Sequence, residues 1–152
     1  MSVTQTKEEP VIRFDTTRFG PLSVAEEKVI TFSRGIPGFA NLRRFILIDH
    51  DAQGLFKWLQ SVDEPSLAFL LTNPNAFRAD YTVPLKRAEI EELGVKDASD
   101  VITLVMVCVS QGENKRVSLN LKGPVVFNSG NMRAVQCIVD RDDYPSDYEI
   151  KV

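Results

Sequence analysis

The sequence is poor in the residues on which most enzymes and metal sites depend. Its 152 residues include one histidine, His50, and two cysteines, Cys108 and Cys137. These three side chains cannot supply the four nitrogen or sulfur ligands of a structural zinc site. A single imidazole also leaves little for acid–base catalysis by histidine. The composition therefore favours a binding protein over an enzyme, with no metal or other cofactor.

Long apolar runs and an excess of positive charge are missing as well. The longest near-continuous apolar run, residues 101–109, is far shorter than the ~20 residues of a membrane-spanning helix. The N-terminus is polar and lacks the apolar core of a secretory signal. A formal net charge of −3 argues against direct binding of nucleic acid. We expect a soluble, cytoplasmic protein whose cysteines are reduced and behave as small buried hydrophobes.

The length corresponds to one domain, which can bury a core without disulfides or metals. Residues 1–10 are predicted to form a disordered tail and residues 11–152 a single domain. Neither an internal repeat nor an interdomain linker divides that region.

Hydrophobic alternation with a period of two dominates the domain and predicts short strands. The predicted strands are 11–14, 28–32, 45–48, 55–61, 67–71, 101–109, 116–121, 125–127 and 134–139. The 101–109 run is apolar on both faces, which is typical of a central strand covered from both sides. One helix is predicted at 84–94, where Gly94 ends it. The pattern predicts a mostly β fold, an antiparallel barrel or sandwich with one short helix.

The polar motifs of the chain have ordinary structural interpretations. The loop 33–41 contains two glycines but lacks the order and the Lys-Ser/Thr ending of a phosphate-binding loop. The turn 49–51, Asp-His-Asp, has no second histidine to complete a metal site. No serine is flanked by nucleophile-elbow glycines. The valines beside Cys108 argue against the electropositive setting of a reactive thiol.

Aromatic residues and two acidic segments remain as binding features. Most strand aromatics are expected in the core, whereas Trp58 is the candidate exception, because tryptophan is often incompletely buried and enriched at binding hot spots. Segment 140–149 has five acids and one base, and segment 89–92 adds three glutamates. Such runs are usually solvated faces. If functional, they would steer a basic partner toward the protein.

Four motifs in their order along the chain resemble the flagellar assembly factor FliW family. They are Gly35-Ile-Pro-Gly-Phe39, Phe56-Lys-Trp-Leu-Gln-Ser61, Pro65-Ser-Leu-Ala-Phe69 and Asn120-Leu-Lys-Gly-Pro-Val-Val-Phe-Asn128. The resemblance runs from about Phe19 to Pro145. The sequence departs from the family pattern at Ala40, at 134–135, in a shorter turn 111–115 and in the tail 146–152.

The resemblance implies a compact, antiparallel barrel-like sheet with one short helix and a non-enzymatic role in flagellar assembly. Proteins of the FliW family are partner-switching chaperones of the cytoplasm. They bind flagellin and also CsrA, an RNA-binding translational regulator, which they antagonise without occupying its RNA site. Export of flagellin frees FliW to capture CsrA, so flagellin translation resumes. The protein is accordingly expected to be monomeric when free.

The candidate partner-binding residues are Phe39, Trp58, Gln60, Glu91, Glu92, Asp140, Asp142 and Asp143. The acidic members are predicted to contact CsrA, since acidic surface speeds association with a basic protein and repels phosphate. An apolar patch near Phe39 and Trp58 is predicted to bind flagellin. The alternative is a small-molecule-binding β-barrel in which Trp58 and Phe69 line a pocket, which a roomy apolar cavity with convergent polar groups would favour.

Overall fold

A computed structural model of the protein describes residues 10–112 and 115–151. The predicted tail 1–10 thus lies outside the described residues, apart from Pro10. The carbonyl oxygen of Pro10 accepts a hydrogen bond from the Glu26 N–H (2.8 Å).

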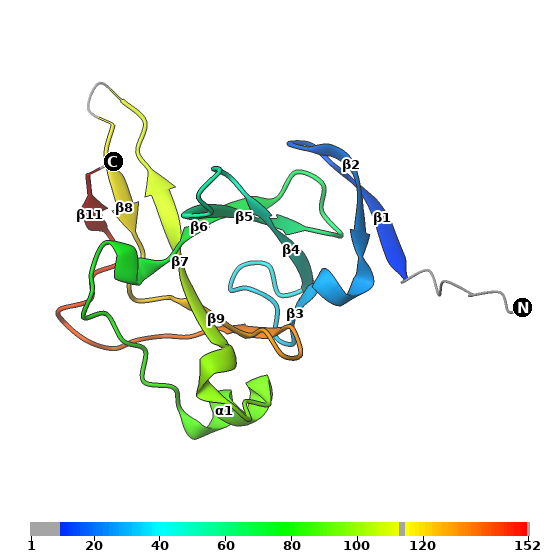
Figure 1. Ribbon diagram of the computed structural model, residues 1–152. Coiled ribbons are helices and arrows are strands. Elements are labelled where there is room, and N and C mark those ends of the chain that lie inside the picture. The colour runs from blue at the N-terminus through cyan, green and yellow to red at the C-terminus, as the bar shows by residue number, and fades with distance from the viewer. Residues whose placement is uncertain (1–9, 113–114, 152) are drawn as a thin grey trace, which may run out of the picture.

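The described residues form eleven strands and one α-helix (Figure 1). The strands are β1 (Val11–Thr16), β2 (Gly20–Ala25), β3 (Ile30–Phe32), β4 (Arg44–Asp49), β5 (Phe56–Ser61), β6 (Ala68–Thr72), β7 (Val101–Val109), β8 (Val117–Leu119), β9 (Val125–Asn128), β10 (Arg133–Gln136) and β11 (Tyr148–Ile150). The helix is α1 (Arg87–Leu93), and single 3₁₀ turns occupy Glu26–Lys28, Pro74–Ala76 and Ala98–Asp100.

Seven strands close into a barrel. Each strand pairs with the next in the order β7, β6, β5, β4, β3, β10, β9, and β9 pairs again with β7. Closure leaves these strands few free edges. The predicted mostly β, barrel-like architecture is confirmed. One pairing differs from the antiparallel prediction, because β10 runs parallel to β3, with Arg133 opposite Thr31 and Ala134 opposite Phe32.

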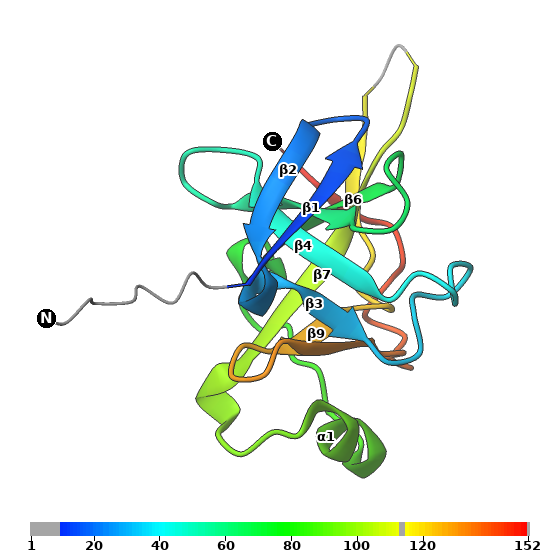
Figure 2. The same ribbon diagram turned by 90° about the vertical axis from the view of Figure 1, so that its right-hand side faces the viewer.

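Two further pieces are attached to the barrel. The last residues of β7 pair with β8, and β8 pairs with β11, so these strands form an arm beside the barrel (Figure 1). The β1–β2 hairpin lies across β4 (Figure 2). A hydrogen bond from the Thr17 N–H to the Pro65 carbonyl (2.9 Å) fastens the hairpin to the turn after β5.

The barrel interior is filled by side chains from alternate strand positions. Phe32 and Phe45 meet edge to face with ring centroids 5.3 Å apart, and both are fully buried. Leu59, Leu71 and Leu104 complete the centre of this cluster. Burying one such side chain stabilises the fold by about 1.5–3 kcal/mol, which is why the period-two pattern identified these strands.

Helix α1 packs on β10 through Leu93, which is buried against Val126, Val135 and Cys137. The Nδ2 atoms of Asn128 and Asn131 both donate to the Leu93 carbonyl oxygen (3.0 and 2.9 Å). These bonds satisfy a helix-end carbonyl that has no partner within the helix. The predicted helix is confirmed, although it is shorter than 84–94.

Several local predictions need correction. The strand predicted at 134–139 ends at Gln136, and Ile138 is exposed. β7 is covered from both sides only near its centre, because its last residues leave the barrel. Cys108 is therefore exposed rather than buried, while Cys137 is buried and both cysteines are free. Burial raises the pKa of the Cys137 thiol to about 12. Strands β2 and β11 were not predicted.

Gly35 and Gly38 lie in the loop between β3 and β4, and both have positive φ (67° and 87°). A Cβ at Gly35 would approach the Ala40 carbonyl oxygen to 2.6 Å, whereas a Cβ at Gly38 would meet nothing within 4 Å. We expect Gly38→Ala to lower the free energy of unfolding by about 1–2 kcal/mol, the cost of a left-handed backbone. Gly35→Ala should lower it further, because backbone atoms of Ala40 must also move. Urea unfolding of both variants measures the difference, and equal losses would contradict the close approach.

Candidate partner-binding surfaces

The Phe39 side chain lies at the surface of the loop between β3 and β4. It is 39% exposed, and its ring packs edge to face on Phe69 of β6 at 5.7 Å. Beside it, this loop, α1 and β10 enclose a cleft of about 240 Å³ whose walls include Ile36, Ala40 and Glu92. An exposed aromatic ring held by a second ring offers a rigid apolar contact with little conformational entropy to lose.

Trp58 is held by two neighbours on the outer face of β5. Its Nε1 donates a hydrogen bond to His50 Nδ1 (3.1 Å). The Arg18 guanidinium lies over the indole ring, 4.0 Å from the centroid, and adds a cation–π contact from the β1–β2 hairpin. The one histidine of the chain thus orients Trp58, which is half-buried.

Phe39 and Trp58 do not form the single apolar patch that the sequence suggested. In the β5–β6 pair, Trp58 stands opposite Leu70 and Leu59 stands opposite Phe69. Successive residues of a strand point to opposite faces of the sheet. Because Phe39 packs on Phe69, Phe39 and Trp58 contact opposite faces, so they can serve one partner only if it wraps around the sheet.

Gln60 is fully buried and has no surface to offer a partner in this structure. Its Nε2 donates to the carbonyl oxygens of Ser61 (3.0 Å) and Pro65 (3.2 Å). The side chain therefore shapes the turn between β5 and β6. Its Oε1 has no hydrogen-bond partner among the described residues.

The two glutamates on α1 are differently placed. Glu91 is exposed and lies 3.5 Å from Arg87 within the helix. Glu92 is half-buried, forms an ion pair with Arg34 (3.2 Å) and accepts a hydrogen bond from Ser33 Oγ. Glu92 thus ties α1 to the loop that carries Phe39, and its charge is partly neutralised.

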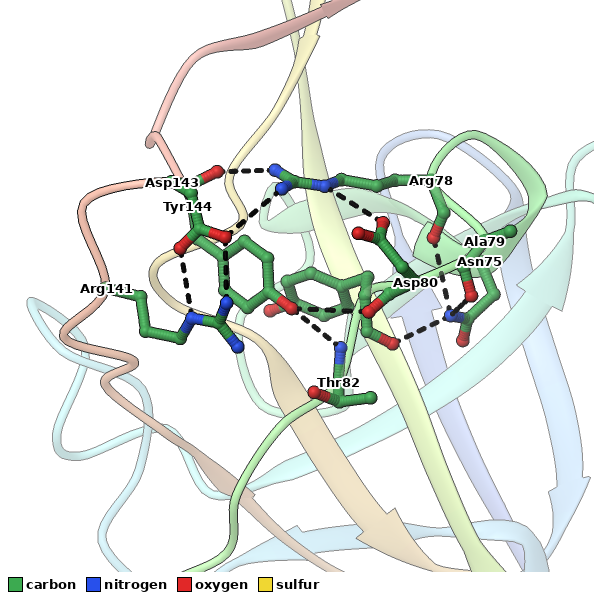
Figure 3. A network of polar contacts seen from close by, with 9 residues as sticks. Asn75, Arg78, Ala79, Asp80, Thr82, Arg141, Asp143 and Tyr144 are labelled. Atoms are coloured by element: carbon green, nitrogen blue, oxygen red, sulfur yellow. Dashed lines mark hydrogen bonds and ion pairs between the residues drawn. The ribbon is translucent and has the colours of Figure 1, made fainter.

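The acidic segment 140–149 is fastened to the loop after β6 by arginines. Asp143 accepts hydrogen bonds from Arg141 (3.0 and 2.8 Å) and pairs with Arg78 (3.4 Å), whose guanidinium also donates to the Asp143 carbonyl (Figure 3). The hydrogen bonds from Arg141 hold the pKa of the Asp143 carboxyl below its usual value. Asp143 therefore acts first as a structural anchor.

Tyr144, next to this anchor, is buried between the same two arginines. The guanidinium carbons of Arg78 and Arg141 lie 4.7 and 4.4 Å from the Tyr144 ring centroid. The Tyr144 hydroxyl accepts from the Thr82 N–H (3.1 Å) and donates to the Asp80 carbonyl (3.4 Å). Asp140 and Asp142 are exposed and form no ion pair with any residue of the described ranges, so they remain available to a partner.

The apolar cleft beside the β1–β2 hairpin gives little support to the small-molecule alternative, and neither Trp58 nor Phe69 lines it. An apolar cleft of about 330 Å³ opens between the β1–β2 hairpin and the barrel wall, lined by residues such as Leu22, Ile48 and Met132. Lys28 supplies the only charged side chain among its lining residues. Convergent polar groups, which fix the orientation of a small ligand, are missing from this lining. Within residues 10–112 and 115–151, no three His, Cys, Asp or Glu side chains are grouped to hold a metal.

The pattern of the FliW protein family matches residues 13–150. The chain belongs to the FliW family. Its four motifs, taken together, were therefore read correctly from the sequence.

Individual relatives agree with this assignment. The chain is 37% identical over 134 residues to the flagellar assembly factor FliW of Caldanaerobacter subterraneus subsp. tengcongensis, covering 88% of this chain and 89% of the relative. It is 38% identical over 128 residues to that of Syntrophotalea carbinolica, covering 84% and 90%. A solved structure, the crystal structure of the flagellar assembly factor FliW, superposes with a TM-score of 0.81 at 26% identity, covering 93% of this chain and 98% of that one.

The depressed pKa of Asp143 makes the stability of this FliW-family protein depend on pH. A carboxyl group whose pKa is lower in the folded than in the unfolded state stabilises the fold at pH values above its unfolded-state pKa of ~3.9. That stabilisation is lost as the pH falls through the folded-state pKa. We expect Asp143→Asn to unfold more easily than the parent protein at pH 7, with the difference shrinking below about pH 4. Denaturant unfolding across pH measures it. Asp142→Asn, which removes no described ion pair, is the control, and a deficit independent of pH would contradict the assignment.

Proposed function

We propose that this protein is a cytoplasmic, non-catalytic flagellar assembly factor that binds flagellin and CsrA in alternation. When flagellin is exported, the freed protein captures CsrA, relieves repression of flagellin mRNA and so couples translation to filament assembly. The observation that carries the proposal is the match to the FliW family over residues 13–150. A stoichiometric mode of action needs binding surfaces and no reacting groups. In the described part of the chain, no helix has the length and apolar character needed to cross a membrane.

The CsrA contact is proposed to lie on exposed acids. Asp140 and Asp142 face solvent beside the Asp143 anchor, and Glu91 is exposed on α1. Fixed negative charge next to a rigid anchor attracts a basic protein before contact and disfavours bound phosphate. Asp143 and Glu92 contribute chiefly by holding these segments in place, because each pairs with an arginine from another segment of the chain.

Reversing the charge of the free acids should slow association with CsrA. We expect Asp140→Lys with Asp142→Lys to lower the association rate at low salt by at least about tenfold, since electrostatic steering sets such rates. The effect should fade as ionic strength rises, because salt screens exposed charges. Stopped-flow or surface-binding kinetics measure the rate.

The matched control changes net charge equally at a distance. Asp15→Lys with Glu27→Lys alters two exposed acids near the β1–β2 hairpin, and it should slow association far less. Equal slowing by both pairs would show that net charge, and not this surface, governs the encounter.

The flagellin contact is proposed to include the Phe39 surface. Phe39→Ala removes an exposed ring that rests on Phe69, so we expect flagellin binding to weaken by at least about tenfold, as truncation of an aromatic hot spot does. Trp58→Ala tests the opposite sheet face separately. Calorimetric titration with flagellin measures both. If neither truncation weakens binding while both variants stay folded, the aromatic residues are not the flagellin surface.

A further inference from the structure

Arg18, His50 and Trp58 form a surface cluster where the tip of the β1–β2 hairpin meets the outer face of β5. The Arg18 guanidinium carbon lies 4.0 Å from the centroid of the indole ring. The His50 ring meets the indole edge to face, with centroids 5.6 Å apart. Arg18 and His50 are exposed, and Trp58 is half-buried. One aromatic ring is thus flanked by two polar side chains that solvent and a partner can reach.

The turn that carries Arg18 is held in place on both sides of this residue. Before it, the Thr17 N–H donates a hydrogen bond to the Pro65 carbonyl (2.9 Å) and so fastens the turn to the barrel. After it, the Phe19 N–H donates to the Thr16 hydroxyl (2.9 Å) and closes the turn on itself. The backbone of Arg18 is therefore fixed before any partner arrives.

The support for this turn is built by residues of the family motifs. The Pro65 carbonyl accepts a second hydrogen bond, from Nε2 of the buried Gln60 (3.2 Å). The Ser61 hydroxyl accepts from the N–H groups of Asp63 (3.2 Å) and Glu64 (2.9 Å) and shapes the same segment. Gln60 thus positions the carbonyl that holds the hairpin tip, although it has no surface of its own.

Both polar neighbours of Trp58 present hydrogen-bond donors to the outside. His50 Nδ1 accepts the indole N–H (3.1 Å), so the proton of the neutral imidazole lies on Nε2, which is left as a donor. The Arg18 guanidinium pairs with no carboxylate of the described residues. Its planar fork of N–H groups matches the two oxygens of a carboxylate.

We propose that Arg18 and His50 bind a carboxylate side chain of flagellin beside the Trp58 ring. This inference rests on the proposed flagellin-binding function and names the chemistry recognised on the Trp58 face of the sheet. Stacking on the indole and the fastened turn both restrict Arg18 in the free protein. Less conformational entropy is then lost on binding than for a freely moving arginine.

Charge favours flagellin over the other occupants of this cluster. Arg18 repels a basic partner such as CsrA, whose contact is proposed on exposed acids elsewhere. Asp49 and Asp51 flank His50 along the chain. These two acids disfavour the row of phosphates of a nucleic acid, whereas a single carboxylate needs only the donors around Trp58. The two proposed partners then use surfaces of opposite charge.

Charge variants of Arg18 test the ion pair. We expect Arg18→Gln to lower the affinity for flagellin at least about tenfold, because hydrogen bonds to a charged group are lost. Arg18→Glu has the size of the glutamine variant but repels a carboxylate, so its affinity should fall further. The control Arg13→Gln makes the same change of charge at an exposed position of β1 and should bind as the parent does. Calorimetric titration of each full-length variant with flagellin gives the affinities.

The single tryptophan of the chain provides an independent readout. A nitrogen-labelled sample gives one indole N–H resonance, that of Trp58, and its presence at a dispersed position in each variant also reports folding. We expect this resonance to shift when unlabelled flagellin binds to the parent protein or to Arg13→Gln.

The outcomes separate the inference from the function on which it rests. If Arg18→Gln binds flagellin as the parent does, or if Arg18→Gln and Arg18→Glu bind equally, no carboxylate contacts Arg18, and the inference is overturned while the proposed function stands. An indole resonance that stays in place while flagellin binds has the same meaning. Absence of any flagellin binding to the parent overturns both. A shift caused by an RNA oligonucleotide and abolished in Arg18→Gln assigns the cluster to phosphate and overturns the flagellin assignment.

Discussion

Pairing of β7 with β9 is the interaction on which the rest of the molecule depends. Four residues of β7, Val101–Leu104, pair with Asn128–Val125 and turn an open sheet into a barrel. The centre of β7 then pairs with β6, and its end pairs with β8. β7 has nine residues and is longer than its pairing within the barrel requires. Its last residues form part of the arm. Closure therefore creates the protected core and leaves the end of β7 outside the barrel, where it pairs with β8.

The sequence predicted the parts of this structure that depend on local pattern. Alternation identified most strands because each inward side chain gains burial energy on its own. Gly94 marked the helix end because its left-handed backbone suits glycine. Strand β11 and the parallel β10–β3 contact escaped prediction, since each is stabilised by a partner distant in the chain and only three or four residues long. The exposure of Cys108 escaped for a related reason: an apolar run does not reveal where a strand leaves its barrel.

The candidate site shows the same division between local and distant information. Counting charges along 140–149 could identify an acidic segment, and the motifs identified the family. The count could not reveal that Arg78, 65 residues away, pairs with Asp143, or that Arg34 pairs with Glu92. Acidic residues that look alike in the sequence thus differ in the structure: some pair with distant arginines and hold segments together, and others are exposed to solvent. Gln60 belongs to a recognisable motif, yet it acts inside the fold, because motif residues include those that shape a surface as well as those that touch a partner.

One of the two asparagines that bind the Leu93 carbonyl, Asn128, connects the helix to the strand pairing that closes the barrel. Asn128 stands in β9 opposite both Val101 of β7 and Arg133 of β10, and its side chain also ends α1. The β7–β9 pairing that closes the barrel and the end of the helix therefore share Asn128. Since cooperative units of a fold follow such shared contacts, the end of the helix and the β7–β9 pairing are expected to unfold together.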